Sequence, residues 1–394
     1  MHPLTLLFLA AGGLALAGCK GERGSATRPS GSGPLPPGEV PSAAPARKAE
    51  RAPTTNERVA VPRGALVAGS TPGDEGRDPA LEPVLLEVEL GGFEIDKLPY
   101  PNDPSKPPRT DISREDARAA CQERGQRLCT ELEWERACKG KDNEMYAAGP
   151  AWDPVCAKDP NSCASGFGVL SMGGVLREWT ASDLQGEDKP RALVRGAPAG
   201  AEAVDHRCAR RMVLEGTTKA ADVGFRCCKG PANAAAIPPF KTPESAFGRL
   251  QLDPARVSKM LAAVPRLAGY AKDVSFFPED DAVKAVLARG DAGAKPGPAL
   301  TTAPVTWMAV PNEEVVAMVV KAKTATLLLA FYRLPGDRYR LASSLVLKDE
   351  PGPVVLAVSN FNRRRIGWST CWECPGESGA FELRDNRRIV IVQH

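Results

Sequence analysis

Eight of the chain's 11 cysteines lie between Cys121 and Cys228, and this cluster constrains the fold more than any other feature of the 394-residue sequence. Cysteines at this density usually occur in exported proteins, where disulfides support a domain that has a weak core. The alternative is a zinc site, but the usual Cys-x2-Cys spacing is absent from this stretch. We therefore expect a disulfide-supported domain in an oxidising compartment.

The first 18 residues predict export. An apolar run from Leu4 to Ala17 is too short to span a membrane but has the length of a signal-peptide core. It ends at Cys19 in Leu-Ala-Gly-Cys, which resembles the lipobox of bacterial lipoproteins. The resemblance implies cleavage before Cys19 and a lipid anchor in the bacterial outer membrane, with the protein periplasmic or surface-exposed. A plain cleaved signal with an incidental cysteine is the alternative.

The segment after Cys19 has no hydrophobic period. Residues 19–84 are rich in Pro, Gly, Ser and Ala, with scattered charges. Such a composition buries too little apolar surface to offset the entropy of an ordered chain. We expect residues 19–84 to be a disordered tether.

Charge and histidine content exclude several classes of partner and cofactor. The net charge is +3, from 51 basic and 48 acidic residues, so the whole chain has no field that would attract nucleic acid. The three histidines are His2, His206 and His394, which excludes metal sites built from several imidazoles.

Two short helices open the middle domain, residues 85–230. Ser113 precedes a helix that Gly125 ends, and Thr130 with Glu133 has the spacing of a capping box at the start of the second helix. Short strand-like pieces between loops follow. The pattern predicts an α+β domain.

Five motifs of this domain, taken in order, resemble those of the formylglycine-generating enzyme family, also called the sulfatase-modifying factor domain. The matching positions are Arg127, Leu128, Thr130, Glu131, Glu133–Glu135, Gly174, Glu178–Thr180, Val194–Gly196, Arg207–Ala209 and Gly224–Arg226. The resemblance implies the C-type-lectin-like fold of that family. Fold alone does not imply activity.

The resemblance also shows what this chain lacks. The family oxidises a cysteine of a nascent sulfatase with a copper-binding cysteine pair between its Val-Arg-Gly-Gly-Ser and Arg-Cys-Ala motifs. Thiolates are the ligands that hold Cu(I) tightly, but residues 196–207 contain no cysteine. We therefore expect a domain without catalytic residues.

For the cysteines that are present, the resemblance implies two structural bridges, Cys121 with Cys227 and Cys138 with Cys208. Four cysteines of the domain remain, and we suggest the pairs Cys129 with Cys228 and Cys156 with Cys163. Neighbouring residues of a strand point to opposite faces, which suits different partners for Cys227 and Cys228.

The family further holds a calcium ion beside its Gly-Asn-Val-Trp-Glu-Trp loop. The matching positions here are Ser171, Gly174, Leu176 and Glu178. The carboxylate is kept, whereas Ser171 and Val175 replace two asparagines, and calcium needs six or more oxygen ligands. The alternative is that Glu178 binds loop amides.

A second domain follows a Pro- and Ala-rich linker at residues 231–243. Within residues 244–394, an apolar helical pattern after Asp253-Pro254 and another around Val286 predict a short helical preface. Runs of Val, Ile, Leu and aromatics, separated by turn residues, then predict an antiparallel β domain with strands at 305–310, 315–321, 326–332, 339–347, 354–358, 365–370, 379–383 and 388–392.

Two features of this β domain admit several interpretations. Cys371 and Cys374 fit a hairpin disulfide, but also a redox site or half of a metal site. Arg363–Arg365, Arg387 and Arg388 form a basic patch that is either a solvated sheet face or a site for lipid or glycan phosphate.

Three functions fit these observations. The first is an envelope lipoprotein whose lectin-like domain binds a protein or glycan, since loops on a rigid frame suit recognition. The second is a surviving oxidoreductase that uses other residues. The third is a structural component of an envelope assembly.

Overall fold

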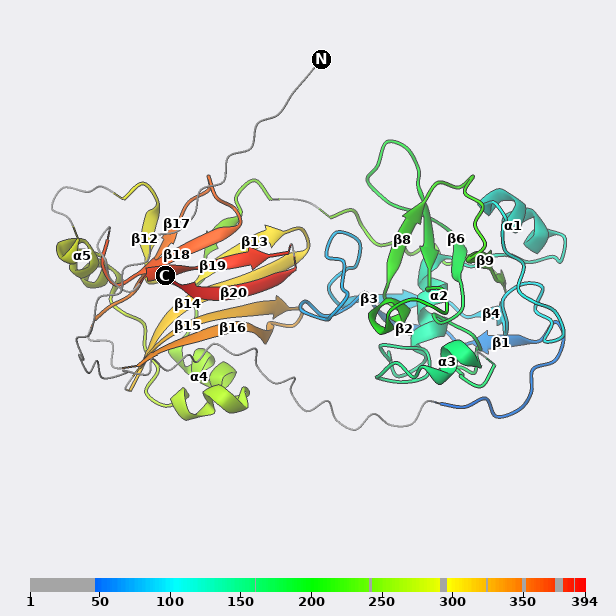
Figure 1. Ribbon diagram of the computed structural model, residues 1–394, viewed down its shortest axis with the longest axis horizontal. Helices are drawn as coiled ribbons and strands as arrows, with labels where there is room; N and C mark the ends of the chain where they lie inside the picture. Colours follow the sequence, from blue (N-terminus) through cyan, green and yellow to red (C-terminus); the bar gives the residue numbers. More distant parts are fainter. Residues whose placement is uncertain are drawn as a thin grey trace, which may run out of the picture. The chain divides into compact units, whose positions relative to one another are not determined.

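The computed structural model describes residues 47–159, 161–240, 243–290, 296–323, 325–348, 352–372, 378–385 and 387–394 (Figure 1). The expected signal peptide, residues 1–18, and Cys19 lie outside this part of the chain, as does Cys374. No described helix is long and apolar enough to cross a membrane.

Both helices expected in the middle domain are confirmed. Ser113 accepts a hydrogen bond from the Asp116 amide at the start of α1 (Arg114–Gln122). Thr130 and Glu133 form the expected capping box of α2 (Glu131–Lys139). A third, single-turn helix, α3 (Val155–Lys158), follows in the loop region. The hydroxyl and carboxylate satisfy backbone amides that a helix start leaves unpaired, which explains why α2 begins where it does.

Short strands complete the α+β middle domain. One sheet has the order β1-β4-β10-β5 and another β8-β7-β6-β9, while β2 and β3 form a hairpin. Strand β9 pairs in parallel with β6, and the other pairs are antiparallel. The strands are β1 (Arg58–Val61), β2 (Gly64–Ala68), β3 (Leu86–Leu90), β4 (Phe93–Asp96), β5 (Arg127–Leu128), β6 (Arg177–Asp183), β7 (Ala192–Arg195), β8 (Arg211–Leu214), β9 (Val223–Phe225) and β10 (Cys227–Lys229).

The boundary expected between tether and domain is wrong. Strands β1 and β2 lie within residues 19–84, which we expected to be a disordered tether. Val61, Leu66 and Ala68 are buried, so this stretch supplies apolar side chains that the composition of the whole segment concealed. The linker 231–243 also packs in part, since Ile237 is buried against Leu66 and Leu90.

All four disulfides expected in the middle domain are present: Cys121–Cys227, Cys129–Cys228, Cys138–Cys208 and Cys156–Cys163. Cys227 and Cys228 are adjacent in β10, and their side chains enter two different hydrophobic clusters. Cys228 packs with Trp134, and Cys227 packs with Trp179. The strand pleat therefore sends two bridges to opposite sides of one sheet.

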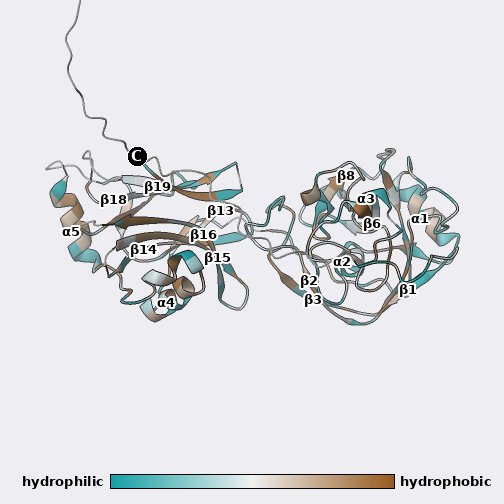
Figure 2. Ribbon diagram, turned by 60° about the horizontal axis from the view of Figure 1, so that its bottom comes forward, coloured by the Kyte–Doolittle hydropathy of each residue, from teal (hydrophilic) through white to brown (hydrophobic). Residues whose placement is uncertain are grey.

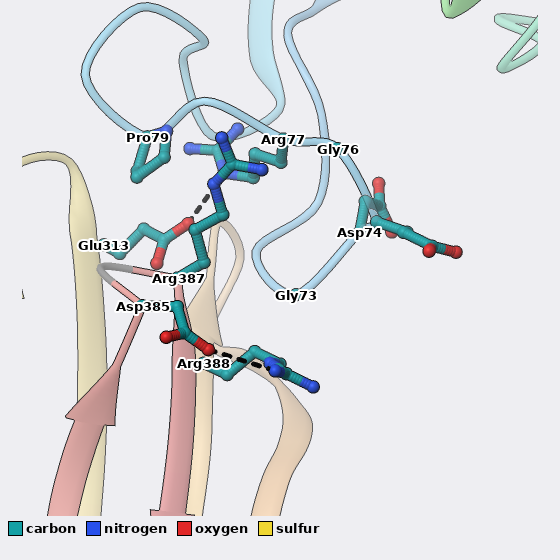
Figure 3. A pocket seen from close by; sticks show the side chains of 10 residues that line it. Gly73, Asp74, Gly76, Arg77, Pro79, Glu313, Asp385, Arg387 and Arg388 are labelled. Atoms are coloured by element: carbon teal, nitrogen blue, oxygen red, sulfur yellow. Dashed lines mark hydrogen bonds and ion pairs between the residues drawn. The ribbon is translucent and has the colours of Figure 1, made fainter. Parts of the chain in front are cut away.

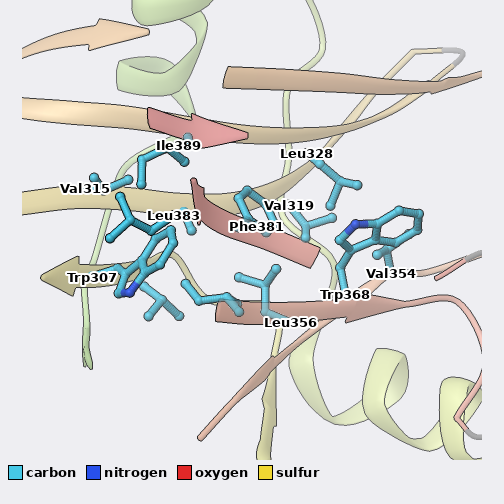
Figure 4. Close-up of a cluster of buried hydrophobic side chains, with 14 of the residues drawn as sticks. Trp307, Val315, Val319, Leu328, Val354, Leu356, Trp368, Phe381, Leu383 and Ile389 are labelled. Atoms are coloured by element: carbon cyan, nitrogen blue, oxygen red, sulfur yellow. The ribbon is translucent and has the colours of Figure 1, made fainter. Parts of the chain in front are cut away.

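The carboxyl-terminal domain is a β-sandwich of two five-stranded sheets, ordered β11-β13-β14-β15-β16 and β12-β17-β18-β19-β20. All eight predicted strands are confirmed, and sequence reasoning missed β11 and β12. The core between the sheets contains Trp307 from one sheet and Trp368 from the other (Figure 4). The strands are β11 (Phe247–Arg249), β12 (Ala299–Thr301), β13 (Val305–Val310), β14 (Glu313–Ala322), β15 (Ala325–Leu334), β16 (Arg338–Lys348), β17 (Val355–Val358), β18 (Arg365–Ser369), β19 (Ser378–Arg384) and β20 (Arg388–Gln393).

Helices of the predicted preface cover the sandwich. Helix α4 (Pro254–Ala262) and the 3-10 helix η2 (Pro265–Tyr270) pack on the outer face of β14 and β15, and α5 (Glu279–Arg289) packs on β17. Val319 faces the inner core, whereas Val320 faces α4. Because both faces of β14 and β15 are covered, these strands are hydrophobic almost throughout (Figure 2).

The neighbouring bridges Cys121–Cys227 and Cys129–Cys228 are expected to stabilise the fold cooperatively. Replacing either pair by serine should cost about 2 to 3 kcal/mol of unfolding free energy, because the other pair still closes nearly the same loop. Replacing all four cysteines of the two bridges should cost more than the sum of the two separate losses.

Urea unfolding followed by tryptophan fluorescence measures these losses. The separate Cys156–Cys163 bridge, with a sequence separation of 7, serves as the control. The free energy lost on its removal should add to the loss for either of the other two bridges. A fourfold variant whose loss equals the sum of the two pairs would contradict the cooperative stabilisation.

Candidate functional site

Helix α2 carries three buried glutamates, and each holds a cation from another part of the domain. Glu131 accepts two hydrogen bonds from Arg211, at 2.8 Å each, and a third from Arg195 at 2.9 Å. Glu135 binds Arg195 and Lys139, both at 2.9 Å. Paired, hydrogen-bonded charges of this kind fix how elements meet, because a lone buried charge is costly.

Glu133 completes this set and is also the cap residue of α2. Its two carboxylate oxygens accept hydrogen bonds from Arg127 at 2.8 Å each. Burial alone would raise the pKa of Glu133, but Arg127 and the Thr130 amide outweigh that effect and hold it below the ordinary value. Burial would also raise the pKa of Glu135. The positive charges of Lys139 and Arg195 outweigh that effect, so the pKa of Glu135 is lowered as well. The glutamates of this motif are therefore structural.

Glu178 joins three of the five family-like motifs. Its carboxylate accepts hydrogen bonds from both Nε (2.7 Å) and Nη2 (2.8 Å) of Arg226, and from Nε1 of Trp134 at 2.8 Å. All three side chains are buried. The contact thus links α2, β6 and the segment between β9 and β10. Glu178 therefore binds two side chains, whereas the sequence suggested calcium or loop amides as its partners.

The four positions that match the family's calcium ligands are Ser171, Gly174, Leu176 and Glu178. Ser171, Gly174 and Leu176 lie in the loop before Glu178, and the Ser171 hydroxyl donates to Asn161 at 3.3 Å. A calcium ion at Glu178 would have to compete with the buried guanidinium of Arg226. Among the described residues, no group of three or more His, Cys, Asp or Glu side chains is arranged to hold a metal ion. The residues present therefore fit calcium poorly.

The segment where the family-like chemistry would require two thiols has a packed aromatic pair. Residues 203–206 form the 3-10 helix η1 (Ala203–His206). The ring of buried His206 stacks on Trp152 with centroids 3.8 Å apart, and its nitrogens lie 2.9 Å from the Gly173 carbonyl and 3.2 Å from that of Ala201. Sequence reasoning missed this pair, because Trp152 stands alone in a loop far from His206.

All eight cysteines of the middle domain are in disulfides, which leaves none of them as a zinc or copper ligand. In the β domain, Cys371 is described, but its expected partner Cys374 lies outside the described residues. That pairing stays a prediction, as does lipidation at Cys19.

A second polar site involves the loop between β2 and β3. Arg77 is buried and pairs with Glu313 of β14 at 2.7 Å, while Arg207 binds Glu82 of the same loop through two bonds of 2.8 and 2.9 Å. Beside Arg77 lies a cavity of about 490 Å³, lined by residues 73–77, Pro79, Glu313, Asp385, Arg387 and Arg388 (Figure 3). The loop between β2 and β3 therefore forms one buried ion pair with β14 of the β domain and another with Arg207 of the middle domain.

With this geometry in place, comparison with known proteins identifies the middle domain. Residues 98–231 match the model of the sulfatase-modifying factor enzyme 1-like domain. A curated relative, the inactive C-alpha-formylglycine-generating enzyme 2 of Bos taurus, is 30% identical over 154 residues, which cover 31% of this chain and 50% of the relative. Residues 98–231 form a domain of this family. The chain spans about half the length of that relative.

Solved structures give weaker likenesses. PvdO from Pseudomonas aeruginosa has a TM-score of 0.37 at 18% identity, covering 46% of this chain and 99% of that one. CarF has a TM-score of 0.34 at 16% identity, with 44% and 97% covered, and Treponema denticola variable protein 1 has 0.33 at 14%, with 44% and 95% covered.

Glu178→Gln is expected to cost about 3 to 5 kcal/mol of unfolding free energy, because it leaves the Arg226 guanidinium buried without its counterion. The matched control is Asp222→Asn, which breaks the partly exposed pair with Arg177, the residue next to Glu178. That change should cost no more than about 1 kcal/mol. Similar urea midpoints for the two variants would contradict the structural role of Glu178.

Acid is expected to destabilise the middle domain. The folded state holds the pKa of Glu133 and Glu135 below the ordinary 4.5, so the stability that they contribute is present above pH 4.5 and is lost as the pH falls below it. Urea midpoints measured from pH 7 downwards test this, with Glu133→Gln expected to flatten the profile. Glu123→Gln, at the exposed end of α1, is the control that should leave the profile unchanged.

Proposed function

We propose that this protein is an envelope lipoprotein whose sulfatase-modifying-factor-like domain binds a protein or a glycan and does not catalyse oxidation. One observation carries the proposal: the eight cysteines of the domain all form structural disulfides, while residues 196–207 contain none. Without a pair of free thiolates the domain lacks the soft ligands that Cu(I) requires. The relative from Bos taurus is itself named as inactive, which supports the same conclusion.

A hollow beside the Ser171 loop suits ligand binding by this domain. Its volume is about 120 Å³, and its lining combines prolines with Asp103, Lys106, Asn161 and Ser171. Rigid apolar walls with a few convergent polar groups are typical of recognition sites. The surrounding loops are held by the Cys156–Cys163 disulfide and by Arg226, which donates to the carbonyls of Lys97 and Leu170.

The absence of turnover is tested first. The purified chain is expected to consume no oxygen with a cysteine peptide from a sulfatase and copper, and to form no aldehyde product by mass spectrometry. Any aldehyde formed at a rate above that of copper alone would overturn the proposal.

Binding is tested with a glycan array and with pull-downs from an envelope fraction. Lys106→Ala with Asn161→Ala should weaken the main signal at least tenfold, which corresponds to about 1.4 kcal/mol. The matched control is Arg63→Ala with Arg118→Ala, on other surfaces of the same domain. An array and pull-down without signal, or a signal equal in both variants, would count against this site.

The proposed anchor has its own test. Metabolic labelling with a palmitate analogue should mark the wild-type chain and leave Cys19→Ala unlabelled, because the acyl groups attach at that residue. Label retained in Cys19→Ala would rule out the anchor while leaving the binding role open.

A further inference from the structure

One aromatic side chain of the β domain lies entirely in solvent. Phe361, in the turn between β17 and β18, is 104% exposed, whereas the other exposed large hydrophobic side chains among the described residues are Val155 at 51% and Met145 at 39%. Full exposure of a phenylalanine leaves its whole apolar surface in contact with water, which costs free energy until a partner covers it. Because the ring is fully exposed, a partner can reach it directly at the turn.

The turn is built to keep Phe361 outward. The Phe361 amide donates to the Ser359 hydroxyl at 3.3 Å, and the Asn362 amide donates to the Ser359 carbonyl at 3.1 Å. The Arg364 amide in turn donates to the Asn362 side chain at 3.2 Å. These local bonds satisfy the backbone without using the aromatic ring, so the exposed ring sits on an ordered turn.

Arginines surround this aromatic tip. The pairing of Arg365 with Glu382 in β18 and β19 brings the β19–β20 turn to the same end of the sheet, and the Leu383 amide donates to the Arg364 carbonyl. We call this surface the Phe361 end and define it as residues 359–365 and 382–384, because the next arginines, Arg387 and Arg388, line the cavity beside Arg77. It contains four arginines and one acidic residue: Arg363, Arg364, Arg365, Arg384 and Glu382.

The one acidic residue does not neutralise the Phe361 end. Its one carboxylate, that of Glu382, lies 3.6 Å from Arg365 and 3.7 Å from Arg384 and is shared between them. In the part of the chain that the structure describes, no carboxylate lies within ion-pair distance of Arg364. Arg363 donates to the carbonyls of Pro243 and Glu244, which hold its charge in place without cancelling it.

We propose that the Phe361 end docks on the surface of an anionic phospholipid bilayer, where Phe361 enters the headgroup region and the arginines contact lipid phosphates. Peripheral proteins bury exposed Trp, Phe and Leu side chains at the headgroup boundary, and clustered Lys or Arg residues favour anionic lipid. The proposal rests on the two features together, since neither a basic face nor a single exposed apolar side chain would point to a membrane by itself. The proposal does not depend on the lipid anchor proposed for Cys19, since a folded chain without the acylated residue can be tested.

The experiment uses the unlipidated chain from residue 20 onward, which retains the whole compact unit of residues 43–394. Cosedimentation is measured with vesicles of phosphatidylglycerol mixed with phosphatidylcholine, and with vesicles of phosphatidylcholine alone. Wild type should bind the anionic vesicles, and binding should fall as salt is raised. Phe361→Ser should weaken binding about tenfold, and Arg364→Glu with Arg384→Glu by more than tenfold.

Matched controls on the middle domain are Val155→Ser for the exposed apolar group and Arg63→Glu with Arg118→Glu for the charge reversal; both should bind like wild type. Failure of wild type to bind anionic vesicles would overturn the proposal, and so would equal losses in test and control variants. Inorganic phosphate at millimolar concentration should not displace the vesicles, and displacement would indicate a site for free phosphate. Binding of a short DNA duplex that depends equally on Phe361 would also overturn the lipid assignment.

Discussion

Buried carboxylates that are paired with cations organise the middle domain, because its short strands and small helices supply little regular structure to do so. Glu131, Glu133 and Glu135 place one helix against three separate segments, and Glu178 does the same for Trp134 and Arg226. Each pair stabilises the fold only when both partners are in place, since a single buried charge without its counterion is strongly unfavourable. The family-like motifs therefore describe a set of mutual constraints on the fold.

Much of this architecture was predictable from local signals. Capping residues located both helices, and runs of branched residues located eight strands, because these patterns act over a few neighbouring residues. The division of the strands into two facing sheets was not predictable, since strand pairing between distant segments leaves no local mark. The tether boundary failed for a related reason: the apolar residues of β1 and β2 are few and lie within a stretch dominated by Pro, Gly and charge.

The candidate site shows the same division between local and distant information. Sequence reasoning found Glu178 but could not tell which group neutralises it, because Arg226 lies 48 residues away in the chain. The stacked pair Trp152 and His206 was missed altogether, although His206 directly precedes the matched segment Arg207–Ala209. What the sequence did establish was an absence of cysteine in a short segment, and an absence of that kind can be read without knowing the fold. The chemical interpretation of the domain depends on it.

The order of the cysteines along the chain has a consequence for biogenesis. Three of the bridges join partners separated by 70, 99 and 106 residues, and two of them end in the last strand of the domain. A polypeptide that enters an oxidising compartment amino terminus first would present Cys121, Cys129 and Cys138 together, long before Cys227 and Cys228 emerge. Premature links among the early three are then the kinetically accessible products, so maturation of this domain should require an enzyme that reshuffles disulfides as well as one that makes them.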